Sequence, residues 1–198
     1  HAYLDKELSV PYMGKHTDMQ RNIYFCDKDG NIRTIESTIL HRCVKASKYN
    51  GIMDNTYVIF PYEKNQPFTE EKLKQSFPNA YDYFISFKAE LSTRDMDEKL
   101  AWFLFGRSQG LQNSCYKKIV FKHVINKAAP VIEPHILEED VIVYSGMYTT
   151  TKQEQMEEIS DIFASANFAK YCSITGKDMS GGYVSISTKM VKQFGIGE

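Results

Sequence analysis

The sequence predicts an α+β fold, in which mixed or antiparallel sheets pack with a few helices. Segments with a strand pattern and segments with helical periodicity both occur along the chain, without the regular β-α-β alternation that builds a parallel sheet. The composition supports a folded core, because 42% of the residues are hydrophobic and 25% are charged. The length of 198 residues suits a single domain over residues 1–198, with N-terminal strands in residues 1–34 and the main core in residues 35–198.

Strand patterns dominate the first 60 residues. "NIYFCDKDGNIRTIE" predicts two strands around an Asp-Lys-Asp-Gly-Asn turn, where Gly30 can adopt a positive φ. A calcium loop is excluded, since the glycine stands at the fourth loop position and Thr38 replaces the bidentate glutamate. "NTYVIFPY" predicts a strand that ends at Pro61.

Two helices are expected next. "FTEEKLKQS" begins a short helix with Thr69 as its N-cap and acidic residues in the first turn. Pro78 suits the first turn of a second helix. The residues with spacings of 4, 3 and 4 that form its apolar face are Ala80, Phe84, Phe87 and Leu91. After it, we assign Trp102, Phe103 and Phe105 to the core.

The C-terminal half mixes both element types. "KKIVFKHVI" and "DVIVYSGMYTT" have strand patterns, and "YVSIS" predicts a last strand before a short helix, "TKMVKQF". Thr151 and Glu154 have the spacing of a capping box. The helix expected to follow has an apolar face of Met156, Ile159, Phe163 and Ala166.

Several features bear on the setting of the chain. Its four cysteines are scattered without a C-x-x-C pair, which favours free thiols in a reducing cytoplasm. The five histidines are dispersed, so we expect no metal site. No run of about 18 apolar residues predicts a membrane span. The chain begins with His1 rather than Met, and we expect it to be part of a longer protein.

The net charge of −1 hides a segregated pattern. Residues 99–132 contain six basic residues and no acid, and residues 37–53 contain Arg42, Lys45 and Lys48 and no acid. These segments can form a positive surface that contacts phosphates. Alternatively, the lysines simply solvate an outer sheet face. Nearby amide and aromatic side chains favour nucleic acid, because such side chains contact bases.

Catalytic motifs are missing from the sequence. It has no G-x-G-x-x-G loop, no P-loop, no G-x-S-x-G elbow, no zinc-deaminase motif and no N-P-P-Y loop of an amino-methyltransferase. A magnesium-dependent nuclease needs an acid and an E-x-K set, which Glu70-Glu71-Lys72 and Asp97-Glu98-Lys99 match only loosely. We therefore expect no catalytic residue in this chain, with the nuclease kept as an alternative.

The order of several segments resembles a known family. They are "ESTILHRCVKASKYNG", "YVIFPY", "FPNAYDYFISFKAELSTRD", "WFLFGRSQGL", "KKIVF" and "SANFAKYCSITGKDMSGGYVSISTKMVKQFGI". This succession, from about Ile35 to Ile196, is similar to the C-terminal TaqI-like specificity domain of bacterial N6-adenine DNA methyltransferases in type II restriction–modification systems. The chain departs from the family at its end, where "FGIGE" replaces a proline-containing tail.

The resemblance implies a non-catalytic, target-recognition-domain-like fold that binds double-stranded DNA and supplies sequence specificity. It implies that S-adenosylmethionine binds the parent enzyme's N-terminal methyltransferase domain, which would be the other partner, and that this fragment holds no cofactor. The expected setting is the bacterial cytoplasm, with the fragment monomeric and without membrane contact. A module that docks on another protein of a restriction–modification complex is a further alternative.

Three groups of residues are candidates for DNA contacts. Arg107, Ser108 and Gln109 lie between two glycines, and a phosphate-positioning or structural role suits Arg107 better than base readout. Basic segments supply phosphate contacts at Lys45, Ser47, Lys48, Lys117 and Lys118. Ser180, Gly181, Gly182 and Tyr183 offer an anion-binding nest of N–H groups and an aromatic ring. The alternatives are an internal ion pair for Arg107, solvated strand edges for the lysines, and a plain bend at the glycines.

Overall fold

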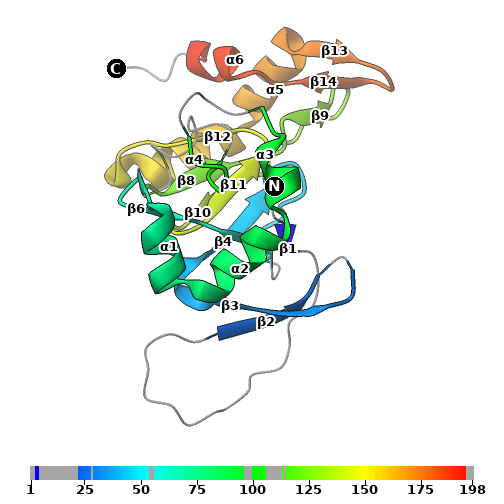
Figure 1. Ribbon diagram of the computed structural model, residues 1–198. Coiled ribbons are helices and arrows are strands. Elements are labelled where there is room, and N and C mark those ends of the chain that lie inside the picture. The colour runs from blue at the N-terminus through cyan, green and yellow to red at the C-terminus, as the bar shows by residue number, and fades with distance from the viewer. Residues whose placement is uncertain are drawn as a thin grey trace. The chain divides into compact units, whose positions relative to one another are not determined.

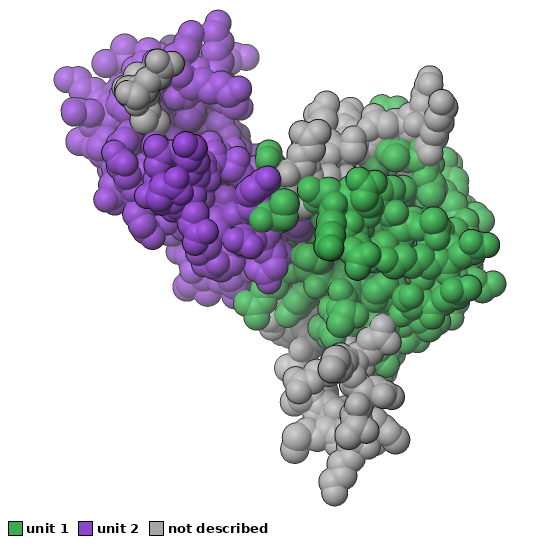
Figure 2. Space-filling model, turned by 90° about the vertical axis from the view of Figure 1, so that its left-hand side faces the viewer, with its two compact units in different colours: residues 1–43, 54–115 green, residues 44–53, 116–198 purple. Residues whose placement is uncertain are grey.

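The computed structural model describes residues 3–4, 22–27, 29–53, 56–95, 100–105, 113 and 115–194. The chain divides into two compact units (Figure 2): residues 1–43 with 54–115 form unit 1, and residues 44–53 with 116–198 form unit 2. The first hairpin belongs to unit 1. The α+β class is confirmed, because both units combine helices with small sheets (Figure 1).

Unit 1 begins its described structure with the predicted hairpin. Strands β2 (Asn22–Cys26) and β3 (Ile32–Glu36) pair antiparallel, with Phe25 opposite Arg33. Gly30 has a φ of 84° and its N–H donates to the carbonyl of Asp27. The Asp27 carboxylate accepts from the N–H groups of Asp29 and Asn31 and from Arg33 Nε at 2.7 Å. The turn is therefore fixed by its own side chain.

A second set of strands in unit 1 contains the predicted "YVIFPY" segment. β5 (Tyr57–Ile59) pairs antiparallel with β1 (Tyr3–Leu4) and with β4 (Leu40–Lys45), where Ile59 lies opposite Leu40. A 3-10 turn, η1 (Ser37–Ile39), leads into β4. The short strands β6 (Tyr62–Glu63) and β7 (Gln66–Pro67) form a hairpin turned by Lys64 and Asn65 at positive φ.

The helices of unit 1 start where the sequence predicts. In α1 (Glu70–Ser76), Thr69 Oγ1 accepts from the N–H of Lys72, and Pro78 is the first residue of α2 (Pro78–Ser86). The expected long helix is broken, because Phe87 (φ −114°, ψ 13°) separates α2 from α3 (Lys88–Ser92). Its apolar face nevertheless holds: Ala80, Phe84 and Leu91 are buried and Phe87 is half-buried.

The aromatic segment after α3 packs in unit 1 as a turn rather than a strand. Phe103 is buried, as predicted for the core, whereas Trp102 and Phe105 are half-buried. The Arg94 guanidinium holds this backbone by donating to the carbonyls of Trp102 and Leu104 at 2.9 and 3.0 Å. Burial lowers the pKa of Arg94. The N–H of Phe105 donates to the Tyr62 hydroxyl at 2.9 Å.

Unit 2 contains two small antiparallel sheets. It also contains the end of β4, and β11 (Ile142–Ser145) lies beside that strand. In the first, β8 (Lys118–Val120) lies between β10 (His135–Leu137) and β12 (Tyr148–Thr149). In the second, β14 (Tyr183–Ser185) lies between β13 (Lys177–Met179) and β9 (Val124–Asn126). "KKIVFKHVI" and "DVIVYSGMYTT" thus each form two short strands rather than one.

The C-terminal helices differ from the prediction at their boundaries. Thr151 does not cap a helix, because its hydroxyl donates to Gln155 Oε1 and a 3-10 turn, η3 (Gln153–Gln155), precedes α4 (Met156–Ala164). Ser165 ends α4 and its Oγ caps α5 (Ala166–Thr175), so Ala166 belongs to the second helix. The predicted short helix is α6 (Thr188–Gln193), and Ser187 Oγ caps it by accepting from the N–H of Met190.

Two apolar clusters stabilise unit 2. The larger one joins α4, α5 and α6 to the β9–β14 sheet through Phe121, Phe163 and Phe168, whose rings pack 4.9 to 6.1 Å apart. Burial there raises the pKa of the Cys172 thiol to about 11, which keeps it a neutral core side chain. The smaller cluster consists of Val44, Ala46, Val120, Leu137 and Val141.

Candidate nucleic-acid interface

The Lys45–Lys48 segment forms a tight turn at the end of β4. The carbonyl of Lys45 accepts from the N–H groups of Lys48 and Tyr49 at 2.9 and 3.0 Å. Tyr49 packs edge-on against the His135 ring, which anchors the far side of the turn. Lys48 is exposed, and Lys45 and Ser47 are half-buried. A fixed backbone with an exposed ammonium group suits contact with a phosphate.

Lys117 and Lys118 differ sharply although they are neighbours. The Lys118 side chain is only 2% exposed, and its ammonium donates to the carbonyls of Tyr116 at 2.7 Å and Glu139 at 3.2 Å. This burial is incompatible with the expected phosphate contact, so Lys118 is removed from the candidate interface. Its role is to satisfy backbone carbonyls. Lys117 is half-buried and pairs with the exposed Glu138 carboxylate at 3.1 Å.

The charge around residues 99–132 is less positive in space than the sequence of this segment suggests. This segment contains no acid, yet Glu138 pairs with Lys117 and Asp178 pairs with Lys127. Of its described lysines, Lys122 is exposed, and it forms no ion pair with a carboxylate of the described residues. The acid-free segment is therefore partly neutralised in space, and its positive surface is smaller than the sequence predicts.

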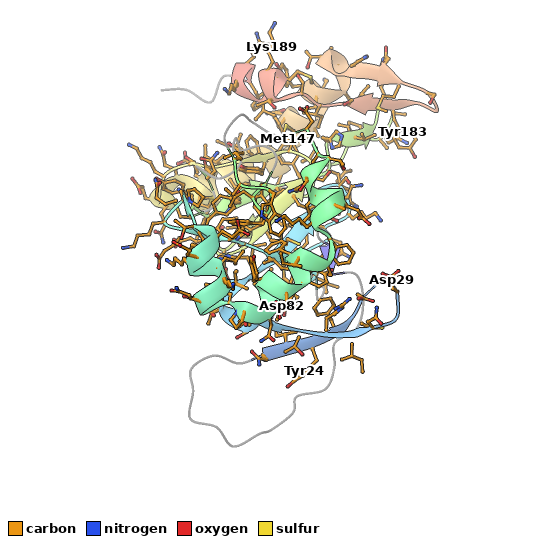
Figure 3. All side chains as sticks on the ribbon, viewed as in Figure 1. Tyr24, Asp29, Asp82, Met147, Tyr183 and Lys189 are labelled. Atoms are coloured by element: carbon orange, nitrogen blue, oxygen red, sulfur yellow. The ribbon has the colours of Figure 1, made fainter. Side chains whose placement is uncertain are left out.

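Ser180, Gly181 and Gly182 form the tip of the β13–β14 hairpin. Gly181 and Gly182 have φ values of 77° and 79°, a conformation that an L side chain adopts only with strain. The glycines therefore have a structural reason to be there, since the turn requires them. All three residues and Tyr183 are exposed, with Tyr183 45% accessible (Figure 3 labels it). The tip is thus available to a partner.

Arg107, Ser108 and Gln109 lie outside the described residues, so their predicted role stays a prediction. The segment that immediately precedes them is firmly held. Arg94 and Tyr62 fix the backbone of residues 102–105, and Trp102 Nε1 donates to Glu70 Oε1 at 3.3 Å.

The residues of the alternative nuclease site are engaged elsewhere. Glu70 accepts from Tyr81 and Trp102, while Lys72 pairs with Glu63 at 2.8 Å. Asp97, Glu98 and Lys99 lie outside the described residues. Within the described part of the chain, no three His, Cys, Asp or Glu side chains gather to hold a metal ion. The same residues contain no helix long and apolar enough to cross a membrane.

The described candidates are associated with two different apolar clusters. The Lys45–Lys48 turn packs on the smaller cluster of unit 2, and the hairpin belongs to the sheet on the larger cluster. Sequence reasoning also missed Lys177, Met179 and Asn126, which share a sheet face with Tyr183. Strand alternation on either side of the Ser-Gly-Gly turn is the signal that would have found Lys177 and Met179.

Comparison with known proteins adds no relative: the chain matches no protein-family model and no curated protein sequence.

Proposed function

We propose that this chain is the DNA target-recognition domain of a bacterial N6-adenine methyltransferase. The observation that carries the proposal is the ordered succession of segments between Ile35 and Ile196 described above. In this role the chain binds double-stranded DNA and contributes sequence specificity. Methyl transfer from S-adenosylmethionine belongs to a separate N-terminal domain of the same cytoplasmic enzyme, and the chain itself acts as a monomer.

Exposed polar groups on fixed backbones support this proposal. Lys48 extends from a turn whose backbone is hydrogen-bonded at both ends, and the Ser180–Gly182 tip leaves its backbone open to close approach. Side chains and N–H groups of this kind position a duplex through its phosphates without reading its sequence. Lys45 adds positive charge to the same turn as Lys48, and Arg107 is assigned a phosphate-positioning role.

Fluorescence anisotropy with a labelled pool of random duplexes tests the proposal. We expect binding at low salt that weakens as salt rises, because each phosphate contact releases counterions and adds about 0.9 to the slope of log K against log salt. Replacing Lys45 and Lys48 together by Ala should lower this slope by roughly 2.

A matched control removes the same charge elsewhere. Lys64 and Lys74 are both exposed and lie in unit 1, outside the candidate interface, so their double Ala variant should keep the slope. Absence of affinity for any duplex at low salt would refute the function. Equal slopes for the two double variants would remove the Lys45–Lys48 turn from the interface.

A further inference from the structure

One face of the β13–β14–β9 sheet is open, and we call it the outer face. Met179, Tyr183 and Asn126 lie opposite one another on the three strands, as do Lys177, Ser185 and Val124 one pair further along. Side chains two residues apart on a strand point to the same side. These six residues therefore line one face, with its most exposed part nearest the hairpin tip.

The opposite, inner face is covered by the unit's own core. Val184 is fully buried and Ile125 is 4% exposed, both within the larger apolar cluster. Helix α5 contributes Phe168, Ala169 and Cys172 to the same cluster, and its C-cap, Gly176, lies so close to the sheet that a Cβ there would be 3.0 Å from Val184 Cβ. On the outer face, by contrast, Met179 is 47% and Tyr183 is 45% exposed. Nearly half of each large side chain is thus accessible to a partner.

The charge on the outer face favours a polyanion. Its six residues include one lysine and no carboxylate. The hairpin's acid, Asp178, alternates to the other side, opposite Val184; its side chain is 72% exposed and its charge is matched by an ion pair with Lys127. The face therefore presents Lys177 beside an aromatic ring, a thioether and an amide, without a negative charge to repel phosphate.

We propose that the outer face enters the major groove of the target DNA and distinguishes base pairs there. This inference rests on the proposed function; it gives base reading to Tyr183, which the sequence singled out, and to Met179 and Asn126, which it did not. The dimensions of the β13–β14 hairpin agree, because its two strands lie about 4.8 Å apart and the groove, about 12 Å wide, admits a two-stranded ribbon; β9, the third strand, then lies at the edge of the groove. Lys177 then contacts phosphate, while Met179, Tyr183 and Asn126 meet base edges.

Asn126 has a restricted way of reading a base. Its Oδ1 already accepts from the N–H groups of Ala128 and Ala129 at 2.8 and 3.1 Å. Bidentate recognition of adenine requires both the oxygen and the NH2 group of an amide. Because the oxygen of Asn126 is already occupied, only its NH2 group can contact a base, as a donor. It therefore favours acceptors such as guanine O6 and N7 or thymine O4. Met179 supplies an apolar surface for a thymine methyl group.

The test begins with selection of a preferred duplex from a randomised pool by the 198-residue chain. The specificity ratio is the affinity for this duplex divided by that for a scrambled one. Replacing Met179 and Tyr183 together by Ala should lower the ratio about 10-fold or more and leave affinity for the scrambled duplex nearly unchanged. Replacing guanine by 7-deazaguanine, or thymine by uracil, in the selected site should lower the affinity of the unsubstituted chain, since the first change removes N7 and the second removes the methyl group from the major groove.

Ile174→Ala with Val131→Ala is the matched control, because both side chains are apolar, are more than 60% exposed and lie in the same unit outside the outer face. This variant should keep the ratio, and circular dichroism should give the same folded spectrum for both variants. An unchanged ratio in the Met179/Tyr183 variant overturns the groove assignment while the proposed function stands. If the Met179/Tyr183 variant instead loses binding to a methyltransferase domain and keeps its binding to DNA, the outer face is a protein contact, and the groove assignment is overturned in that case too. No duplex binding by the parent chain refutes the function itself.

Discussion

Glu36 provides the sharpest test of how unit 1 is held together. This carboxylate on β3 is 2% exposed and accepts from the N–H and the side-chain amide of Asn79 at 2.8 and 2.9 Å, and from the N–H of Ala80 at 3.0 Å. Phe77, which precedes α2, provides no side-chain cap. Glu36 therefore caps a helix 43 residues away in sequence and complements the positive end of its dipole.

Glu36→Gln keeps the shape of the side chain and removes one acceptor. The remaining amide oxygen can serve both donors of Asn79, but the new NH2 group faces the N–H of Ala80 in a buried position. A hydrogen bond to a charged group contributes about 1.5–3 kcal/mol, and an unsatisfied buried donor costs about 1–3 kcal/mol. Since these terms overlap, we expect a loss of roughly 2–4 kcal/mol in the free energy of unfolding.

The single tryptophan, Trp102, lies in unit 1, so its fluorescence in urea follows that unit. With a urea slope of about 2 kcal/mol per molar, the midpoint should fall by roughly 1–2 M. Asp82→Asn removes the same charge from an exposed position on α2 (Figure 3) and should change stability by less than about 0.5 kcal/mol. Equal midpoints for Glu36→Gln and Asp82→Asn would refute the capping role.

Three more predictions test other parts of the structure. The hydrogen bond from Arg33 lowers the pKa of the Asp27 carboxyl from 3.8 to about 2. The stabilisation that the ionised carboxyl gives to the fold is therefore present above pH 4 and is lost as the pH falls toward 2. Asp27→Asn should therefore flatten the fall of the urea midpoint between pH 4 and pH 2, and a profile equal to the parent's would contradict this reasoning. Gly146→Ala should destabilise unit 2 more than Gly182→Ala in thermal unfolding by circular dichroism. Both glycines have a positive φ, which costs an alanine about 1–2 kcal/mol, but only at Gly146 would the new Cβ lie 2.7 Å from Ala46 Cβ. Equal losses of stability in the two variants would argue against the clash. Lys118→Met should cost about 1–3 kcal/mol, since two carbonyls lose their donor, and unchanged amide hydrogen exchange in β8 would count against it.

The features that the sequence predicted well depend on neighbours a few residues away. Thr69 caps α1 by accepting from the N–H of Lys72, three residues later. Gly30 lies in a hairpin turn whose backbone hydrogen bonds all join residues of that turn. Pro78 begins a helix because its own ring sets φ and its missing N–H is not needed there. Such signals are complete within one short window of sequence.

The features that it missed are set by partners far along the chain. Thr151 has the spacing of a capping box but its hydroxyl bonds to Gln155, and Ser165 begins a new helix within what reads as one periodic segment. Lys118 has the same residue type as Lys117, yet it lies in a strand between β10 and β12 and is only 2% exposed. Charge and periodicity along the sequence do not reveal which strand lies at the centre of a sheet.

The ion pairs within unit 2 also bear on how the proposed interface divides its work. Lys117 and Lys127 are each matched by a carboxylate, and the chain as a whole has a net charge of −1. Because non-specific binding comes almost entirely from phosphate contacts, such a surface holds arbitrary DNA only weakly. On the proposed function, the partner methyltransferase domain then supplies most of the affinity, while the outer face of the β13–β14–β9 sheet supplies the difference between sequences. Loss of Lys48 should accordingly weaken every duplex alike, whereas loss of Met179 should change which duplex is preferred.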